Sequence, residues 1–155
     1  MIYLAAKYDV EGILPMSIEN MWQSLWKENI IGIDTETTGL CPHKDKIIML
    51  QLGTEKDQFV IDARTENLPY LLDLIESKNI KKVGHNLKFD YKMFLGNYST
   101  LIQNIYDTMI SECVLECGKE GIRFGLDKIC KKYKINLSIN KEKGSLRTQF
   151  TNWGS

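Results

Sequence analysis

The sequence predicts a single α/β domain whose helices pack against a mixed sheet. Apolar runs of strand length alternate along the chain with segments that carry apolar residues at helical spacing, which is typical of layered α/β folds. The Ile-rich run at residues 30–33 indicates a strand buried on both faces, as in the centre of such a sheet. With 155 residues and 43% hydrophobic content, the chain has enough apolar side chains for one substantial core.

The first half of the chain supplies most of the expected sheet. Residues 2–4 form a short edge strand, and Ser17 caps a helix. The apolar run that begins at residue 30 and ends in two acids follows as the central strand. Residues 46–52 and 58–62 are the next strands, joined as a hairpin. The apolar face of the helix comprises Ile18, Met21, Trp22, Leu25 and Trp26. Its two tryptophans could stack on bases in a groove, but beside Met and Leu their spacing favours packing onto the sheet.

Helices and short strands alternate in the second half of the chain. A helix opens at residues 67–69, with Pro69 tolerated in its first turn. Short strands at 81–84 and 105–106 flank a helix at 87–95. Two more helices are expected at 107–117 and 124–133, with inward residues Met109, Ile110, Cys113, Val114 and Cys117 in the first and Leu126, Ile129, Cys130 and Tyr133 in the second.

Composition restricts the class of protein. Twenty Lys and Arg balance twenty Asp and Glu, so overall charge does not indicate a nucleic-acid partner. The four cysteines lack a paired Cys-x-x-Cys arrangement, which favours buried reduced thiols over a zinc site or disulfides. No leader and no apolar run of membrane-spanning length is evident, and we therefore expect a soluble, cytoplasmic protein with no membrane partner.

The two ends of the single domain, residues 1–155, differ from its centre. Residues 1–28 form an N-terminal strand and helix extension, and residues 134–155 form a basic tail. The tail is consistent with a solvated chain end and, equally, with a basic strip that binds the phosphates of a nucleic acid.

Two acids end the central strand. Asp34 and Glu36 are two residues apart, so in a strand they lie on one face with Cα atoms about 6.6–7 Å apart. Paired carboxylates repel each other, and a divalent cation such as Mg²⁺, which prefers carboxylate oxygens, relieves that repulsion. Solvated acids at a strand end are the simpler explanation for this pair considered alone.

A second group of polar residues follows the strand at 81–84. The segment His-Asn-Leu-Lys-Phe-Asp at residues 85–90 lies between a strand and a helix, where active-site residues commonly lie in open α/β sheets. Asn86 and Asp90 are four residues apart and share a helical face. Alternatively, Asn86 caps the helix and Asp90 is a solvated first-turn acid.

Together these motifs resemble the DEDD superfamily of 3′–5′ exonucleases. The resemblance rests on Asp-Thr-Glu-Thr-Thr-Gly-Leu at 34–40, His-Asn-Leu-Lys-Phe-Asp at 85–90 and Tyr-Asp-Thr-Met at 106–109. It is greatest to the proofreading domain of family A DNA polymerases (bacterial DNA polymerase I and phage relatives) and to ribonuclease D. It implies a ribonuclease H-like fold, with a mixed sheet of about five strands flanked by helices.

The resemblance also implies roles for individual residues. Asp34, Glu36 and Asp90 match the family's metal ligands for two Mg²⁺ or Mn²⁺ ions, which support phosphodiester hydrolysis. The residues that match the substrate-binding positions for a 3′-terminal nucleotide are Thr37, Thr38, Gly39, Leu40, His85 and Asn86. A frayed single strand can enter such a site, whereas an intact duplex cannot, so the expected substrate is a single-stranded 3′ end.

One motif of the family is missing. The family's third motif, Tyr-x-x-x-Asp or His-x-x-x-x-Asp, supplies a fourth carboxylate, and no aspartate follows Asp127 here. Asp107 matches a structural family residue, Asp127 lies beside Lys128, and Glu142 lies in the basic tail, so these acids are poor replacements. The chain is therefore a fragment, half of a split protein whose partner chain supplies the motif, or a domain that kept strand binding and lost hydrolysis. A fragment or split polymerase would make a polymerase domain or chain its partner.

Three functions follow as hypotheses. The first is a metal-dependent 3′–5′ exonuclease acting on single-stranded DNA in proofreading, impaired by the missing motif. The second is a non-catalytic domain that grips single strands or docks on a polymerase. The third is a ribonuclease D-like exoribonuclease, for which no residue visibly reads a 2′-hydroxyl.

Overall fold

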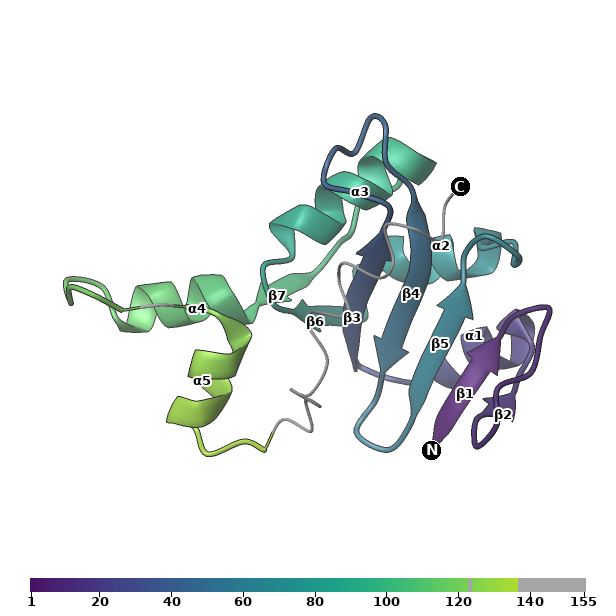
Figure 1. The fold of residues 1–155 in the computed structure, drawn as a ribbon, viewed down its shortest axis with the longest axis horizontal. Helices are drawn as coiled ribbons and strands as arrows, with labels where there is room; N and C mark the ends of the chain where they lie inside the picture. The colour runs from purple at the N-terminus through teal and green to yellow at the C-terminus, as the bar shows by residue number, and fades with distance from the viewer. Residues whose placement is uncertain (123, 137–155) are drawn as a thin grey trace.

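A computed structural model of the chain describes residues 1–122 and 124–136. Within them, one seven-stranded sheet has the order β2-β1-β5-β4-β3-β6-β7 (Figure 1). The strands are β1 (Ile2–Ala5), β2 (Leu14–Pro15), β3 (Ile30–Thr37), β4 (Ile47–Gly53), β5 (Gln58–Asp62), β6 (Lys81–Gly84) and β7 (Ile105–Asp107). The helices are α1 (Ile18–Leu25), α2 (Pro69–Glu76), α3 (Lys88–Tyr98), α4 (Thr108–Leu115) and α5 (Leu126–Lys132). Most of the predicted basic tail, including Glu142, lies outside the described residues.

The sheet is mixed, as predicted. Strand β4 runs antiparallel to both β3 and β5, which confirms the hairpin, whereas β6 and β7 continue parallel to β3. The sheet has more strands than the five or so expected. The two-residue strand β2 pairs outside β1, so residues 2–4 do not form the edge. No periodic pattern predicts a strand this short.

The core lies on one face of the sheet. Ile31, Ile33 and Thr35 of β3 are buried, and the two isoleucines belong to a core cluster that includes apolar residues of α1 and α2. The alternate residues of β3 are not buried, and Asp34 is exposed. The prediction that β3 is buried on both faces is therefore wrong. The acids occupy the open face, and burying them would have cost their hydration.

Helix α1 begins as the sequence predicts. The Ser17 hydroxyl accepts a hydrogen bond from the Asn20 amide at 3.3 Å. Trp22 packs against the core, while Trp26 stacks on it with ring centroids 5.4 Å apart and remains 44% exposed. The prediction that both tryptophans pack inward therefore holds fully for Trp22 and only in part for Trp26.

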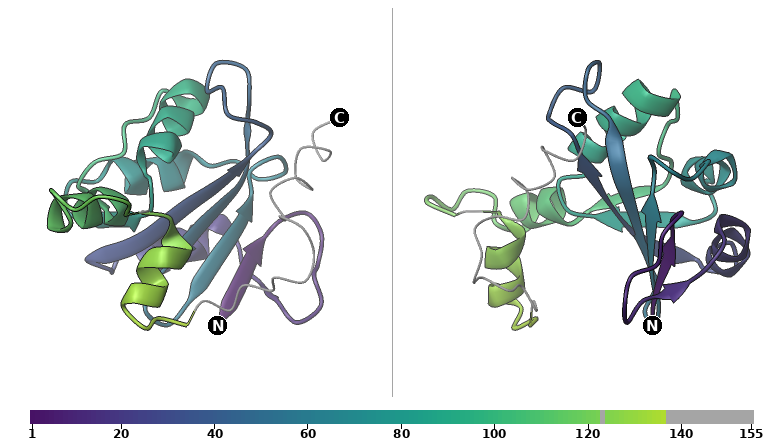
Figure 2. Two further views of the ribbon diagram at one scale, coloured as in Figure 1. Left: turned by 60° about the vertical axis from the view of Figure 1, so that its left-hand side comes forward. Right: turned by 45° about the vertical axis from the view of Figure 1, so that its right-hand side comes forward.

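Helices α4 and α5 stand out from the sheet beside its β7 edge (Figures 1 and 2). The predicted inward face of α4 is wrong for Ile110 and Val114, which are exposed, whereas Met109 and Cys113 are half-buried; the buried residue of this helix is Glu112. Leu126 and Tyr133 of α5 are exposed as well, and Cys130 is buried. All four cysteines are free, but the prediction of buried thiols is correct only for Cys130. Cys41 and Cys113 are half-buried, and Cys117 is exposed.

A polar contact replaces the apolar packing expected between α4 and α5. The Lys132 ammonium pairs with both Glu112 and Glu116, and the Tyr133 hydroxyl donates to Glu112 at 2.9 Å. Hydrogen bonding from Lys132 holds the pKa of Glu112 below its usual value. Helical periodicity cannot distinguish this charged contact from an apolar one. It gives the spacing of apolar residues along a helix, but it does not say which residues of another helix will lie against them. Among the described residues, no helix is both long and apolar enough to span a membrane.

Candidate active site

An open cavity of about 740 Å³ lies between the carboxyl end of β3 and helices α3, α4 and α5. It gathers residues from segments far apart in the sequence. From β3 and the following loop come Asp34, Thr35, Glu36, Thr37, Gly39 and Leu40; from the β6–α3 region come His85, Asn86, Phe89 and Asp90; from α4, α5 and the residue before α5 come Met109, Gly125, Leu126 and Asp127. Eight of the nine sequence-predicted site residues therefore lie around one cavity.

Thr38 is the exception. Its hydroxyl accepts a hydrogen bond from the Lys46 amide at 2.9 Å, and its own amide donates to the Lys46 carbonyl at 2.9 Å. These contacts close the β3–β4 loop. The structure therefore gives Thr38 a position in the loop and not on the cavity wall.

Strand register sets the direction of the two acids on β3. Asp34 pairs with Gln51 and Glu36 with Met49 on β4, so both acids are on the open face of the sheet. The register shifts between Glu36 and Thr37, and an irregularity of this kind bends the strand. The acids therefore lie at the end of the strand, where the chain turns away from the sheet.

The loop after β3 presents one apolar side chain. A Cβ on Gly39 would lie 2.6 Å from the carboxylate of Asp45, so only glycine fits without movement. Asp45 in turn accepts a hydrogen bond from the Cys41 amide at 2.7 Å, which tightens the loop. Leu40, which lies between Gly39 and Cys41 in this loop, is 83% exposed at the edge of the cavity.

Asp90 is the buried acid of the site. It lies in the first turn of α3 with 3% of its surface exposed, and the Thr35 hydroxyl donates to its Oδ1 at 2.6 Å. Burial raises the pKa of Asp90 to about 6; the Thr35 hydrogen bond opposes this shift, and the negative charge of Asp34 adds to it. The charge of Asp34 acts on Asp90 because the two carboxylates share the cavity.

The carboxylates of these acids are suitable ligands for a divalent cation, but their side chains are not arranged around a single ion. Carboxylate oxygens are the donors that Mg²⁺ and Mn²⁺ prefer, and a cation would favour the ionised form of Asp90. Within residues 1–122 and 124–136, however, no three His, Cys, Asp or Glu side chains form a ready-made metal cluster. Bringing Asp34, Glu36 and Asp90 onto one ion therefore requires side-chain movement.

The turn between β6 and α3 is held by Asp107. Its carboxylate accepts hydrogen bonds from the amides of Asn86 at 3.1 Å and Leu87 at 2.7 Å, and from Met109 and Ile110 in α4 at 2.9 and 3.3 Å. The structural role expected for Asp107 matches these contacts. Asn86 does not cap α3; it has a φ of 61°, a left-handed conformation that asparagine tolerates.

Several lining residues have no local sequence signal. Thr35 contacts Asp90 although strand alternation places it on the face opposite Asp34. Met109, Leu126 and Asp127 reach the cavity because α4 and α5 fold beside it. Asp127, set aside from the sequence as a replacement ligand, does line the cavity.

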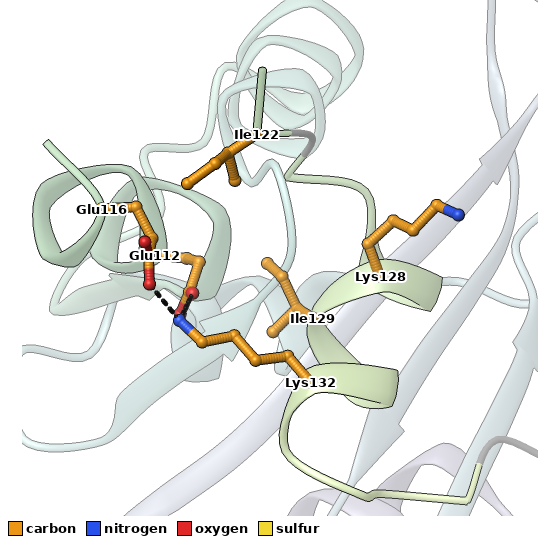
Figure 3. Close-up of a pocket in the computed structure, with 6 residues that line it drawn as sticks. All are labelled: Glu112, Glu116, Ile122, Lys128, Ile129 and Lys132. Atoms are coloured by element: carbon orange, nitrogen blue, oxygen red, sulfur yellow. Dashed lines mark hydrogen bonds and ion pairs between the residues drawn. The ribbon is translucent and has the colours of Figure 1, made fainter. Parts of the chain in front are cut away.

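A second, smaller cavity of about 290 Å³ separates α4 from α5 (Figure 3). Lys132 reaches from α5 to the two glutamates of α4, while Ile122 and Ile129 provide apolar walls. The ion pairs of Lys132 with the two glutamates join α5 to α4 across this cavity, and they hold α5 near the larger cavity.

Comparison with known proteins identifies the class. A family model described as 3′–5′ exonuclease matches residues 16–153, and the chain belongs to this family of DEDD exonuclease domains. DNA polymerase I of Aquifex aeolicus is 40% identical over 84 residues, which cover 54% of this chain and 13% of that protein. DNA polymerase I of Borreliella burgdorferi is 28% identical over 137 residues, covering 82% of this chain and 15% of that protein. The chain thus spans about a seventh of these relatives.

Solved structures show the same fold. Brucella melitensis NrnC matches with a TM-score of 0.67 and 23% identity, covering 94% of this chain and 65% of NrnC. The catalytic core of RRP6 from Trypanosoma brucei matches with a TM-score of 0.71 and 18% identity, covering 95% of this chain and 39% of the core. The ribonuclease H-like α/β architecture predicted from the sequence is confirmed.

Proposed function

We propose that this domain hydrolyses phosphodiester bonds at the 3′ ends of single-stranded DNA, as a proofreading module acts, with two Mg²⁺ or Mn²⁺ ions. The main support is the gathering of Asp34, Glu36 and Asp90 around one cavity at the end of β3. Two relatives in sequence are DNA polymerase I of Aquifex aeolicus and of Borreliella burgdorferi, which favours DNA. A structure of Brucella melitensis NrnC holds Mg²⁺, which supports a divalent ion as cofactor.

Each group around the cavity has a task in this proposal. Asp34, Glu36 and Asp90 would hold the ions, which when bound supply an activated water and neutralise charge on the phosphate. Asp90 must lose its proton to take part, and its pKa of about 6 allows this at neutral pH. The exposed Leu40 contacts the terminal base, and the backbone near Thr37 and Gly39 borders the sugar.

The test is degradation of 3′-labelled single-stranded DNA with Mn²⁺. Wild type should release the labelled 3′-terminal nucleotide, and Asp34→Asn should lose most of that activity. Asp73→Asn, a change at an exposed acid of α2, is the matched control and should behave as wild type. Equal degradation by wild type and Asp34→Asn would exclude catalysis at this site.

Substrate choice needs its own comparison, because Brucella melitensis NrnC has been seen bound to pGG and RNase D is among the structural neighbours. Single-stranded DNA and RNA of one sequence should be offered together to the enzyme. Faster loss of the DNA supports the proofreading assignment, whereas faster loss of RNA favours an exoribonuclease. A duplex with a flush end should react more slowly than either strand alone.

A non-catalytic binding domain is the second candidate. It is favoured by the lack of a ready-made three-ligand cluster in the described part of the chain. This function predicts strand binding in EDTA that weakens with salt, and a flatter salt dependence when the chain is cut after Tyr133. Binding that requires Mn²⁺ would contradict it.

A further inference from the structure

His85 is fixed by a short chain of hydrogen bonds. Its Nδ1 lies 3.0 Å from the Thr108 hydroxyl oxygen, and that hydroxyl donates to the Gly84 carbonyl at 3.0 Å. A threonine hydroxyl has one proton, and here the carbonyl takes it. The contact with His85 therefore requires the ring to donate through Nδ1–H.

This contact determines what the other ring nitrogen can do. In a neutral imidazole with the proton on Nδ1, Nε2 carries a lone pair and accepts hydrogen bonds. His85 also lines the cavity that holds Asp34 and Asp90. The acceptor nitrogen lies on the edge of the ring away from Thr108, and it belongs to a residue that lines this cavity.

The other two members of this hydrogen-bond chain, Thr108 and Gly84, are held in place by the fold. Thr108 is the first residue of α4, which Asp107 caps through the Met109 and Ile110 amides. A Cβ on Gly84 would lie 2.8 Å from the Ile33 carbonyl, so β6 approaches β3 closely at this point. The tautomer is therefore set before any ligand binds, which lowers the cost of ordering the contact.

We propose that Thr108 is a positioning residue that holds His85 in the Nδ1–H tautomer, so that Nε2 accepts a hydrogen bond from a sugar hydroxyl of the terminal nucleotide. This inference rests on the proposed function for the identity of the ligand. Phosphodiester oxygens have no proton to give, and the N–H donors of the bases differ in kind and position from one base to the next. A sugar hydroxyl is the donor present at every 3′ end, whichever base the terminal nucleotide carries.

The tautomer is tested first, without nucleic acid or metal. Nitrogen-15 NMR at neutral pH distinguishes a protonated ring nitrogen from one with a lone pair, and His43→Gln assigns the signals because the chain has two histidines. Wild type and Thr108→Ser should show Nδ1–H, and Thr108→Val should move towards Nε2–H. A wild-type ring protonated at Nε2 alone would overturn the proposal, whether or not the chain is a nuclease.

The ligand is tested by binding and by turnover. The His85 Nε2 signal should move on titration with deoxynucleoside monophosphate, and much less with the 2′,3′-dideoxy form; a shift that needs the ribonucleotide assigns the contact to the 2′-hydroxyl instead. In Thr108→Val, loss of one hydrogen bond should raise KM about 3- to 10-fold with little change in kcat. Thr108→Ser, which keeps the hydroxyl, should have the KM of wild type.

The controls separate this inference from the proposed function. Equal Nε2 shifts with hydroxyl-ended and dideoxy-ended nucleotides would overturn the hydroxyl contact. Absence of strand degradation, with the hydroxyl-dependent shift retained, would contradict hydrolysis and leave the contact standing. The folded state of each variant is checked by its thermal unfolding midpoint.

Discussion

Replacing Asp90 with asparagine should stabilise the metal-free protein at pH 7. In the fold the pKa of Asp90 is raised to about 6, against about 3.9 in an unfolded chain, so folding takes up a proton between these values. Because the folded pKa is the higher one, the carboxyl's stabilising contribution is complete below pH 4 and is lost as the pH rises through 6. About two pKa units at 1.36 kcal/mol each correspond to about 3 kcal/mol.

Asparagine removes that loss, because it never ionises and its carbonyl oxygen can still accept the Thr35 hydroxyl. The Asp90→Asn variant should therefore unfold roughly 6–12 °C above wild type at pH 7, at 2–4 °C per kcal/mol, and close to wild type at pH 4. The assay is thermal unfolding followed by circular dichroism from pH 4 to 8 in EDTA. Asp73→Asn, exposed on α2, should follow wild type throughout.

Two results would refute this reasoning. One is an Asp90→Asn variant no more stable than wild type at pH 7; the other is an unchanged slope of stability between pH 4 and 6. Adding Mn²⁺ then tests the metal proposal separately, because an ion that binds only the folded state raises its unfolding temperature. Wild type should gain stability with Mn²⁺, and Asp90→Asn should gain little.

Three further changes probe the supports of the site. Asp107→Ala removes a helix cap and leaves the buried Leu87 amide without its acceptor, which should cost about 2–4 kcal/mol in urea unfolding; a loss below about 1 kcal/mol contradicts the supporting role. Burial lowers the pKa of Lys82 to about 8, whereas the lysine of the unfolded chain keeps its proton up to about pH 10.4. Wild-type stability should therefore rise between these two pH values. Lys82→Met should flatten this rise, measured as urea unfolding midpoints, and an equally steep rise would exclude Lys82 as its source. Glu112→Gln should speed amide hydrogen exchange in α5 but not in α2, whereas unchanged exchange in α5 would show that the Lys132 contact is not what holds it.

Local patterns were enough to predict the elements that carry the acids. Alternation along a strand places Asp34 and Glu36 on one face whatever surrounds them, because it is a property of the extended backbone. The Ser17 cap and the β4–β5 hairpin depend likewise on neighbours close in sequence, and both are present. The motifs at 34–40, 85–90 and 106–109 together were also sufficient to identify the family.

Contacts between distant segments decided the rest. The hydrogen bond from Thr35 to Asp90, and the burial that shifts the pKa of that acid, arise only when α3 packs against β3. Helix periodicity placed Ile110 inward, yet α4 turns Glu112 to α5 because Lys132 meets it there. By itself, then, the sequence determined which acids share a strand or a helix, since backbone geometry is local. Only the tertiary structure decided which of them is buried, which residues complete the cavity and which nitrogen of His85 donates, since these depend on the neighbours that folding brings together.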